Sequence, residues 1–215
     1  MRPLALVLVA LALAACGDRQ PATTAATPAP EADSSPPADR AGAQRPIAPG
    51  SRPDSTTATI RIEGTDEPVD LRLVTVEDVP LPFSTYVPAG WTDDVLGSGE
   101  GTGARFAMGG SGAEGVVTVF VPSEPNRAGI EELARVVAES NGTARAMTDR
   151  PAWARAGYTF SGPAALGSVL VGEHAGVPFY ILRTFPPDMG DGFAPRAALV
   201  LDRLRWADDG TALGG

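Results

Sequence analysis

The sequence predicts an α+β domain, in which an antiparallel sheet carries two packed helices. From residue 57 to residue 206, short segments rich in β-branched and aromatic residues alternate with Gly, Pro and Asp, and two other segments have helical spacing. Short connections between the strand segments favour antiparallel pairing. Strands in runs, with one helix in the middle and one at the end, are typical of an α+β layered domain.

The expected strands follow from these segments. They lie near residues 57–63, 69–76, 83–88, 103–108, 115–121, 144–148, 153–160, 166–172 and 178–185. Gly172 and Gly176 flank a predicted turn between the last two strands, and the Gly109-Gly110-Ser111-Gly112 run predicts a second hairpin. The glycines at 97, 99, 101 and 103 lack the Lys of a phosphate-binding loop, so we interpret them as a hairpin or loop tip.

Two helices are expected. In the first, Ile130, Leu133, Ala134 and Val137 recur at helical spacing, and Asn141-Gly142 supplies a stop. In the second, behind Pro195, the apolar residues make one stripe. Its members are Phe193, Ala197, Val200, Leu201 and Leu204. Each helix has one apolar side, which we expect to lie on the sheet.

Residues 1–15 have the pattern of a secretory signal peptide. Arg2 precedes an apolar run that is too short to span a bilayer. The run ends in Leu13-Ala14-Ala15-Cys16, which resembles the lipobox that bacterial lipoprotein signal peptidases recognise. The resemblance implies cleavage before Cys16, the single cysteine, and acyl chains such as palmitate on it. Because more than one acyl chain holds a protein stably at a membrane, we expect a lipid-anchored lipoprotein.

The location follows from the same resemblance. Gly17, not Asp, comes after the cysteine, which under the enterobacterial sorting rule implies the outer membrane, with the chain facing the periplasm. Residues 16–56 contain eight prolines and one large apolar residue, Ile47, and such a composition predicts a disordered linker. The globular domain is then expected at 57–206 and a flexible tail at 207–215.

The charge of the chain argues against nucleic-acid binding. The formal net charge is −9, and every basic residue is Arg because the sequence contains no Lys. Such a surface repels phosphate backbones. We therefore expect the lipid anchor to bind the membrane and a protein of the cell envelope to be the partner.

The order of elements resembles the PsbP-like fold, a layered sandwich. The similarity covers about residues 80–206: a strand and turn reading Phe83-Ser84-Thr85-Tyr86-Val87-Pro88-Ala89-Gly90-Trp91, a middle helix, and a closing helix that runs into Leu204-Arg205-Trp206. This family implies a non-catalytic role in docking to a larger assembly. The metal-binding residues of its photosynthetic members have no matching motif here.

Catalytic and metal sites have few candidates. A Ser-His-Asp hydrolase would need His174, the one histidine, with Ser111 in an imperfect G-x-S-x-G setting. Carboxylates that could gather around calcium are Asp188, Asp191 and Glu173, or Asp93 with Asp94, but the EF-hand series is absent. A zinc site lacks ligands. We expect no enzyme activity, no metal and no cofactor, with the hydrolase as a remote alternative.

Aromatic residues supply the other candidate site. Trp91, Trp153, Tyr158 and Phe179 lie in or beside apolar segments and are interpreted as core, or as the lining of a ligand groove. The predicted function is that of a membrane-tethered, non-catalytic docking module. The alternative is a carrier of a small apolar ligand.

Overall fold

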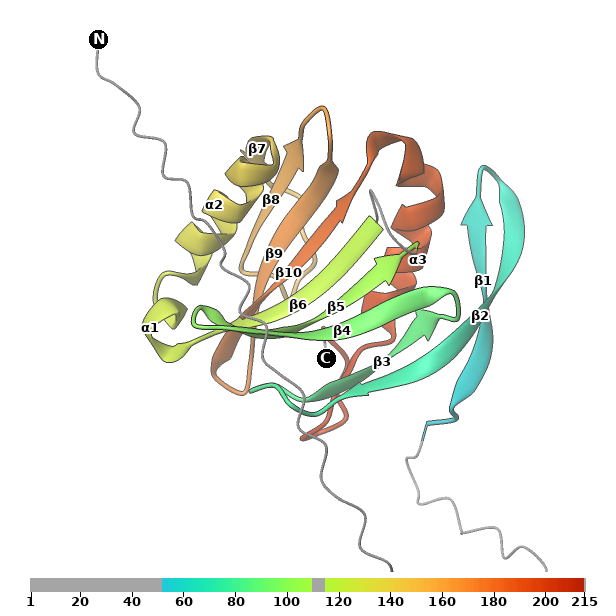
Figure 1. Ribbon diagram of the computed structural model, residues 1–215, viewed down its shortest axis with the longest axis horizontal. Helices are drawn as coiled ribbons and strands as arrows, with labels where there is room; N and C mark the ends of the chain where they lie inside the picture. The colour runs from blue at the N-terminus through green and yellow to red at the C-terminus, as the bar shows by residue number, and fades with distance from the viewer. Residues whose placement is uncertain (1–51, 110–114, 215) are drawn as a thin grey trace, which may run out of the picture. The chain divides into compact units, whose positions relative to one another are not determined.

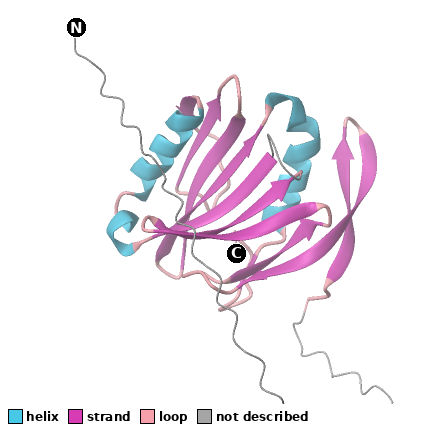
Figure 2. Ribbon diagram, viewed as in Figure 1, coloured by secondary structure: helices cyan, strands magenta, loops and turns pink. Residues whose placement is uncertain are grey.

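The structure, a computed structural model, describes residues 52–109 and 115–214 (Figure 1). These residues form two antiparallel sheets, one of seven strands and one of four. The predicted α+β class with its PsbP-like layered sandwich is wrong, because strands dominate this part of the chain and helices are a minor component (Figure 2). The reason is that stretches expected to be loops, or the end of a helix, pair as additional strands.

The larger sheet holds the segments from the middle of the chain. Its strands, in spatial order, are β4 (Trp91–Ser98), β5 (Gly101–Met108), β6 (Gly115–Pro122), β10 (Val177–Phe185), β9 (Leu166–His174), β8 (Ala156–Ser161) and β7 (Thr143–Ala146). Every neighbouring pair is antiparallel. β10, at the centre, is therefore hydrogen-bonded on both sides.

The smaller sheet joins the two ends of the described chain. Its order is β1 (Ser55–Ile62), β2 (Thr65–Val76), β3 (Phe83–Pro88) and β11 (Arg205–Trp206). β11 pairs with β3 through Arg205 opposite Ser84 and Trp206 opposite Phe83. This pairing brings the residues after the last helix back to the beginning of the domain.

Both predicted helices are confirmed. They are α2 (Ile130–Asn141) and α3 (Gly190–Asp202), and a short helix precedes each of them, α1 (Glu124–Arg127) and η1 (Pro187–Met189). α2 buries Ile130, Ala134 and Ala138 and ends at Asn141, as expected. α3 ends before Leu204, which is buried outside the helix.

Two apolar cores of the described chain lie on opposite faces of the larger sheet, and a smaller one lies between β1, β2, β3 and α3. The main core fills the space between this sheet, the smaller sheet and α3, with Phe179 and Ile181 of β10 among its members. A second core lies under α2 and contains Tyr180 of the same strand. Because successive strand residues point to opposite faces, β10 supplies side chains to both layers.

The two predicted hairpins are confirmed by the pairing of β9 with β10 and of β5 with β6. The first turn is tighter than expected: His174 pairs with Val177, and only Ala175 and Gly176 lie between, both with positive φ. Such a two-residue turn matches the twist of the strands. The run of glycines at 97–103 forms the ends of β4 and β5 and the tip between them, as interpreted from the sequence.

Four elements were not expected. β4 overlaps none of the predicted strands, and α1 and η1 were not foreseen. Residues 204–206 were assigned to the end of the closing helix, although Arg205 and Trp206 form β11. β8 also begins at Ala156, later than the expected strand at 153–160. Ala154 N donates to Pro151 O at 2.9 Å, so the chain turns just before this strand.

Residues at both ends of the domain pack against it. Arg52, within the predicted linker, donates to Ser84 Oγ at 2.9 Å and to Arg203 O at 2.8 Å. At the other end, in the predicted tail, Thr211 O accepts a hydrogen bond from Trp206 N, and Leu213 packs on the main core. The predicted signal peptide, its lipobox and Cys16 lie outside the described residues. None of the described helices is long and apolar enough to cross a bilayer.

Candidate ligand-binding groove

A row of polar side chains crosses one face of the larger sheet. Thr159 of β8 lies opposite Ser168 of β9, and Ser168 lies opposite Arg183 of β10. Opposed residues of neighbouring strands point to the same face, so these three side chains are neighbours. Arg183 is also in phase with Phe179 and Ile181, which belong to the main core. A cationic side chain therefore stands on the face that α3 covers.

Arg183 is held by one neutral oxygen. Its Nε and Nη2 donate to Ser168 Oγ at 3.1 and 2.9 Å, and Ser168 is only 4% exposed. Among the described residues no carboxylate forms an ion pair with Arg183. Burial lowers the pKa of Arg183, but the guanidinium keeps its positive charge at physiological pH because its ordinary pKa is so high.

The remaining nitrogen of this guanidinium is open to solvent space. Arg183 Nη1 has no hydrogen-bond partner in the part of the chain that the structure describes. In the same part, every fully buried side-chain nitrogen or oxygen does have a partner. Nη1 is thus not sealed in the core, and a molecule in the adjoining space can reach it.

Two cavities meet at Arg183. The larger, of about 440 Å³, is lined largely by apolar side chains, among them Trp153, Leu170, Ala198, Leu201 and Leu213. The smaller, of about 290 Å³, contains the row of Thr159, Ser168 and Arg183 together with Phe185, Phe193 and Ala194. We call these two cavities together the α3 groove. Pockets for small molecules have volumes of about 300 to 1,000 Å³, so the groove has a suitable size.

The position of α3 explains why the groove exists. The helix lies chiefly on β3 and β1 and touches β6 and β10. It is anchored there by Thr85 Oγ1, which donates to Val200 O at 2.5 Å. The helix lines the smaller cavity with Ala194, beside Ser168, and the larger one with Ala198, and these short side chains leave the space next to them unfilled. Small residues on a helix next to larger neighbours create such a space because the backbone cannot close over it.

The four aromatic residues predicted to line a groove are not all together. Trp153 stacks on Phe179 at 6.0 Å, and Trp153 borders the larger cavity. Trp91 stacks on Phe193 at 5.5 Å in the main core. Tyr158 packs against the second core, on the α2 face of the sheet. The structure thus brings Trp153 to the α3 groove, with Phe179 packed behind it in the main core, and places Tyr158 on the opposite face of the sheet.

Gly172 makes room for the stacked pair. A Cβ atom at this position would lie 2.5 Å from Phe179 Cζ and 3.0 Å from Trp153 Cε3. Both distances are shorter than a normal contact, so a side chain at 172 would push the rings away. Gly172, which the sequence predicted to flank a turn, lies within β9. There it leaves room for the Trp153 ring that lines the groove.

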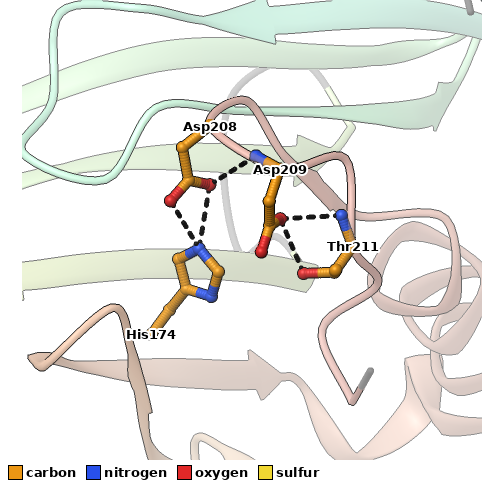
Figure 3. A network of polar contacts seen from close by, with 4 residues as sticks. All are labelled: His174, Asp208, Asp209 and Thr211. Atoms are coloured by element: carbon orange, nitrogen blue, oxygen red, sulfur yellow. Dashed lines mark hydrogen bonds and ion pairs between the residues drawn. The ribbon is translucent and has the colours of Figure 1, made fainter.

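His174 and two carboxylates form a polar cluster at the hairpin tip (Figure 3). His174 Nε2 lies 2.9 and 3.0 Å from the two carboxylate oxygens of Asp208. Thr211 donates to Asp209 Oδ1 from its amide and its hydroxyl, both at 2.8 Å. These two hydrogen bonds, backbone first, lower the pKa of Asp209. His174 exposes only 14% of its side chain.

This cluster could also offer ligands to a metal ion. One atom from each of His174, Asp208 and Asp209 lies within 4.8 Å of the others, and no other group of this kind occurs in residues 52–109 and 115–214. The carboxylates predicted as calcium ligands are not part of this cluster. Asp93 pairs with Arg72, Asp94 with Arg105, and Glu173 with Arg155. The hydrogen bonds of His174 with Asp208, and of Asp209 with Thr211, explain how the side chains of the cluster are arranged.

The cluster positions one wall of the groove. The chain passes from Asp208 and Asp209 through Thr211 to Ala212, Leu213 and Gly214, and the last three line the larger cavity. A bridge between Arg205 and Ala212 fixes the return of the chain. The segment expected to be a tail therefore closes the groove beside Trp153.

The remaining predicted site residues lie before residue 52 or between residues 110 and 114. Leu13, Ala14, Ala15 and Cys16, like Ser111 of the hydrolase hypothesis, lie outside the described residues. Within the described chain, the hydrogen-bond partner of His174 is Asp208, and no hydroxyl group is bonded to it. No protein-family model matches the sequence, and comparisons with curated proteins and with solved structures find no match.

Sequence reasoning missed Arg183, although a signal for it exists. Phe179, Ile181 and Arg183 alternate with Tyr180 and Leu182 along one predicted strand. An Arg in phase with two large apolar residues is expected to face the same buried layer. Such a residue is rarely buried without a partner, so its phase was the feature that could have indicated a site.

Proposed function

We propose that the chain is a lipid-anchored, non-catalytic binding protein that holds a small, largely apolar molecule in the α3 groove. The observation that carries the proposal is the pair of cavities that meet at Arg183, lined mainly by apolar side chains. Small-molecule sites are typically apolar hollows with a few fixed polar groups. Ser168 and Arg183 are such groups, and the strands that carry them are held by neighbours on both sides.

The membrane anchor is the second part of the proposal and is supported by the sequence. The Leu13-Ala14-Ala15-Cys16 lipobox precedes a stretch whose composition predicts a linker. A tether of this kind would keep the domain at the outer membrane, on the periplasmic side, where it can meet amphiphilic molecules released from lipid. Such an anchor needs no spanning helix, because the acyl chains hold the protein at the membrane.

Docking to an envelope protein stays a prediction. In the described part of the chain, the large apolar side chains with high exposure are Val95 on β4 and Val136 on α2. They belong to different elements, and single exposed apolar residues are ordinary on protein surfaces. The groove is the feature that favours ligand binding over docking.

The proposal is tested with the chain from residue 16 onward carrying Cys16→Ser, which prevents acylation and removes the need for detergent. Dodecanol, a neutral apolar probe, is titrated below its aggregation concentration while tryptophan fluorescence is followed. Trp153 lines the larger cavity, so its emission reports occupancy. We expect saturable binding of one dodecanol per chain.

Two variants show where the probe binds. Ala198→Phe places a ring in the larger cavity and is expected to weaken binding about tenfold or more, because the space is no longer available. Val136→Phe, on an exposed site of α2, is the matched control and should leave the affinity unchanged. Binding that does not saturate, or that is insensitive to Ala198→Phe, would overturn the proposal.

A further inference from the structure

We infer that the ligand of the α3 groove is an amphiphile with one carboxylate and one apolar chain, and that its carboxylate binds Arg183 beside Ser168. This inference rests on the proposed function and adds the chemical class of the ligand. It starts from the charge of Arg183. A buried cation is normally paired with an anion, whereas here the described chain supplies only the Ser168 hydroxyl oxygen.

The free hydrogen-bonding capacity of Arg183 has a direction. Nε and Nη2 are both engaged by the same Ser168 oxygen, on the side toward β9. Nη1 has no partner among the described residues and is not fully buried, so it can donate into the groove. A guanidinium offers several fixed N–H donors, and a carboxylate can accept two of them at once. Arg183 can therefore bind an anion without releasing Ser168.

The surroundings favour a single negative charge. Of the described residues that line the two cavities, Arg183 is the only cation, and Asp202, in the larger cavity, is the only carboxylate. A phosphate monoester carries close to two negative charges at neutral pH. Such a group would be only half compensated by Arg183 and would be repelled by Asp202. A carboxylate carries one charge, which Arg183 balances by itself, and the repulsion from Asp202 is weaker than for a phosphate.

The apolar chain of the ligand has a place beside its headgroup. Leu170, Leu201 and Leu213 line the larger cavity next to Arg183, together with Trp153. A carboxylate fixed at Arg183 thus leads its hydrocarbon chain directly into this cavity. The hydrocarbon chain of the ligand then shields the guanidinium from solvent. This strengthens the attraction between the carboxylate and Arg183, because the local dielectric constant falls.

The experiment compares three probes with the same apolar chain: dodecanoate, dodecanol and dodecyl phosphate. Binding to the chain from residue 16 onward, with Cys16→Ser, is measured by titration calorimetry below the aggregation concentration of each probe. We expect dodecanoate to bind about tenfold tighter than either of the others, with one site per chain. Arg183→Gln should remove this preference and leave the dodecanol affinity almost unchanged, while Arg183→Lys retains part of it.

Each outcome separates the two proposals. If dodecanol binds but dodecanoate is no tighter, the inference is wrong and the proposed function stands. A dodecyl phosphate affinity above that of dodecanoate also overturns the inference, since it indicates a phosphorylated ligand. If none of the three probes binds, the proposed function itself fails. Should Arg183→Gln not fold, as judged by circular dichroism, the comparison of the three probes on the unsubstituted groove still decides.

Discussion

His174 lies flat on Trp206: their ring centroids are 4.6 Å apart, and the ring planes are inclined by 12°. His174 ends β9 of the larger sheet, and Trp206 ends β11 of the smaller sheet. The contact therefore ties the two sheets together at the point where the chain turns back toward the groove. Asp208 is hydrogen-bonded to Nε2 of the same ring, so stacking and hydrogen bonding together fix the His174 side chain.

Loss of the Asp208 carboxylate should loosen the groove wall. Asp208→Asn keeps the size of the side chain but removes the charge that accepts from His174, and we expect unfolding to become easier by about 0.5 to 1.5 kcal/mol. Amide exchange at Thr211 and Leu213 should accelerate. Asp188→Asn, on the exposed surface of η1, is the control. Unchanged exchange at Leu213 in Asp208→Asn would show that the cluster does not hold this segment.

Gly172→Ala should destabilise the domain because the new Cβ meets the rings of Phe179 and Trp153. Overpacking of this kind costs about 1 to 3 kcal/mol. Gly90→Ala is a matched control, since a Cβ there meets nothing within 4 Å and φ is not positive. Urea unfolding of the two variants gives the comparison. Equal stabilities for both would contradict the close packing around Gly172.

Tyr180 makes the stability depend on alkaline pH. Burial, with a smaller contribution from the charge of Glu100, raises its pKa to about 12. The unfolded chain ionises near the ordinary value of about 10, so it loses the proton first and stability falls as the pH rises from there toward the folded pKa. The loss approaches about 1.4 kcal/mol for each unit of pKa difference.

The control for this dependence is Tyr180→Phe, which removes the ionisable hydroxyl and keeps the ring that stacks on Phe120. Its stability should fall less between pH 10 and pH 12 than that of the unsubstituted chain. Denaturant unfolding at several pH values measures this. Parallel curves for the two proteins would mean that Tyr180 is not shielded from water.

Cys16 should be the first residue of the mature protein. When the full chain is expressed in a bacterium that processes lipoproteins, intact mass spectrometry is expected to show an acylated amino terminus at Cys16, and the protein should enter the detergent phase. Cys16→Ser should lack the acyl chains because the thiol is the attachment site. An unmodified mature terminus at another residue would rule out the anchor.

The strand that the sequence did not reveal explains why the fold class was wrong. β4 buries Trp91, while Thr92, Asp93, Asp94 and Val95 are exposed. It lies at the edge of its sheet, where backbone pairing with β5 holds it, so no alternation of apolar residues marks it. β11 has only two residues, and its partner β3 lies near the other end of the domain in the sequence. A pairing between such distant segments cannot be predicted from local sequence patterns. The sequence did predict the segments that have a buried face, such as β9, β10 and both longer helices.

The groove shows the same division between local and long-range information. The phase of Arg183 within β10 can be obtained from the sequence, because the strand alternates regularly. The register that sets Ser168 opposite Arg183, and the placement of α3 over β3 and not over β9, depend on contacts between distant segments. These two facts create the cavities, so the site could be assembled only with the three-dimensional structure.

The most direct test of ligand binding in the α3 groove is nuclear magnetic resonance of the isotope-labelled chain from residue 16 onward, with Cys16→Ser, during addition of dodecanol. We expect shifts that saturate at one equivalent and are largest at the amides of Leu170, Ala198 and Leu213, which line the larger cavity. Shifts centred on Val95 or Val136, or no saturable shifts at all, would contradict it.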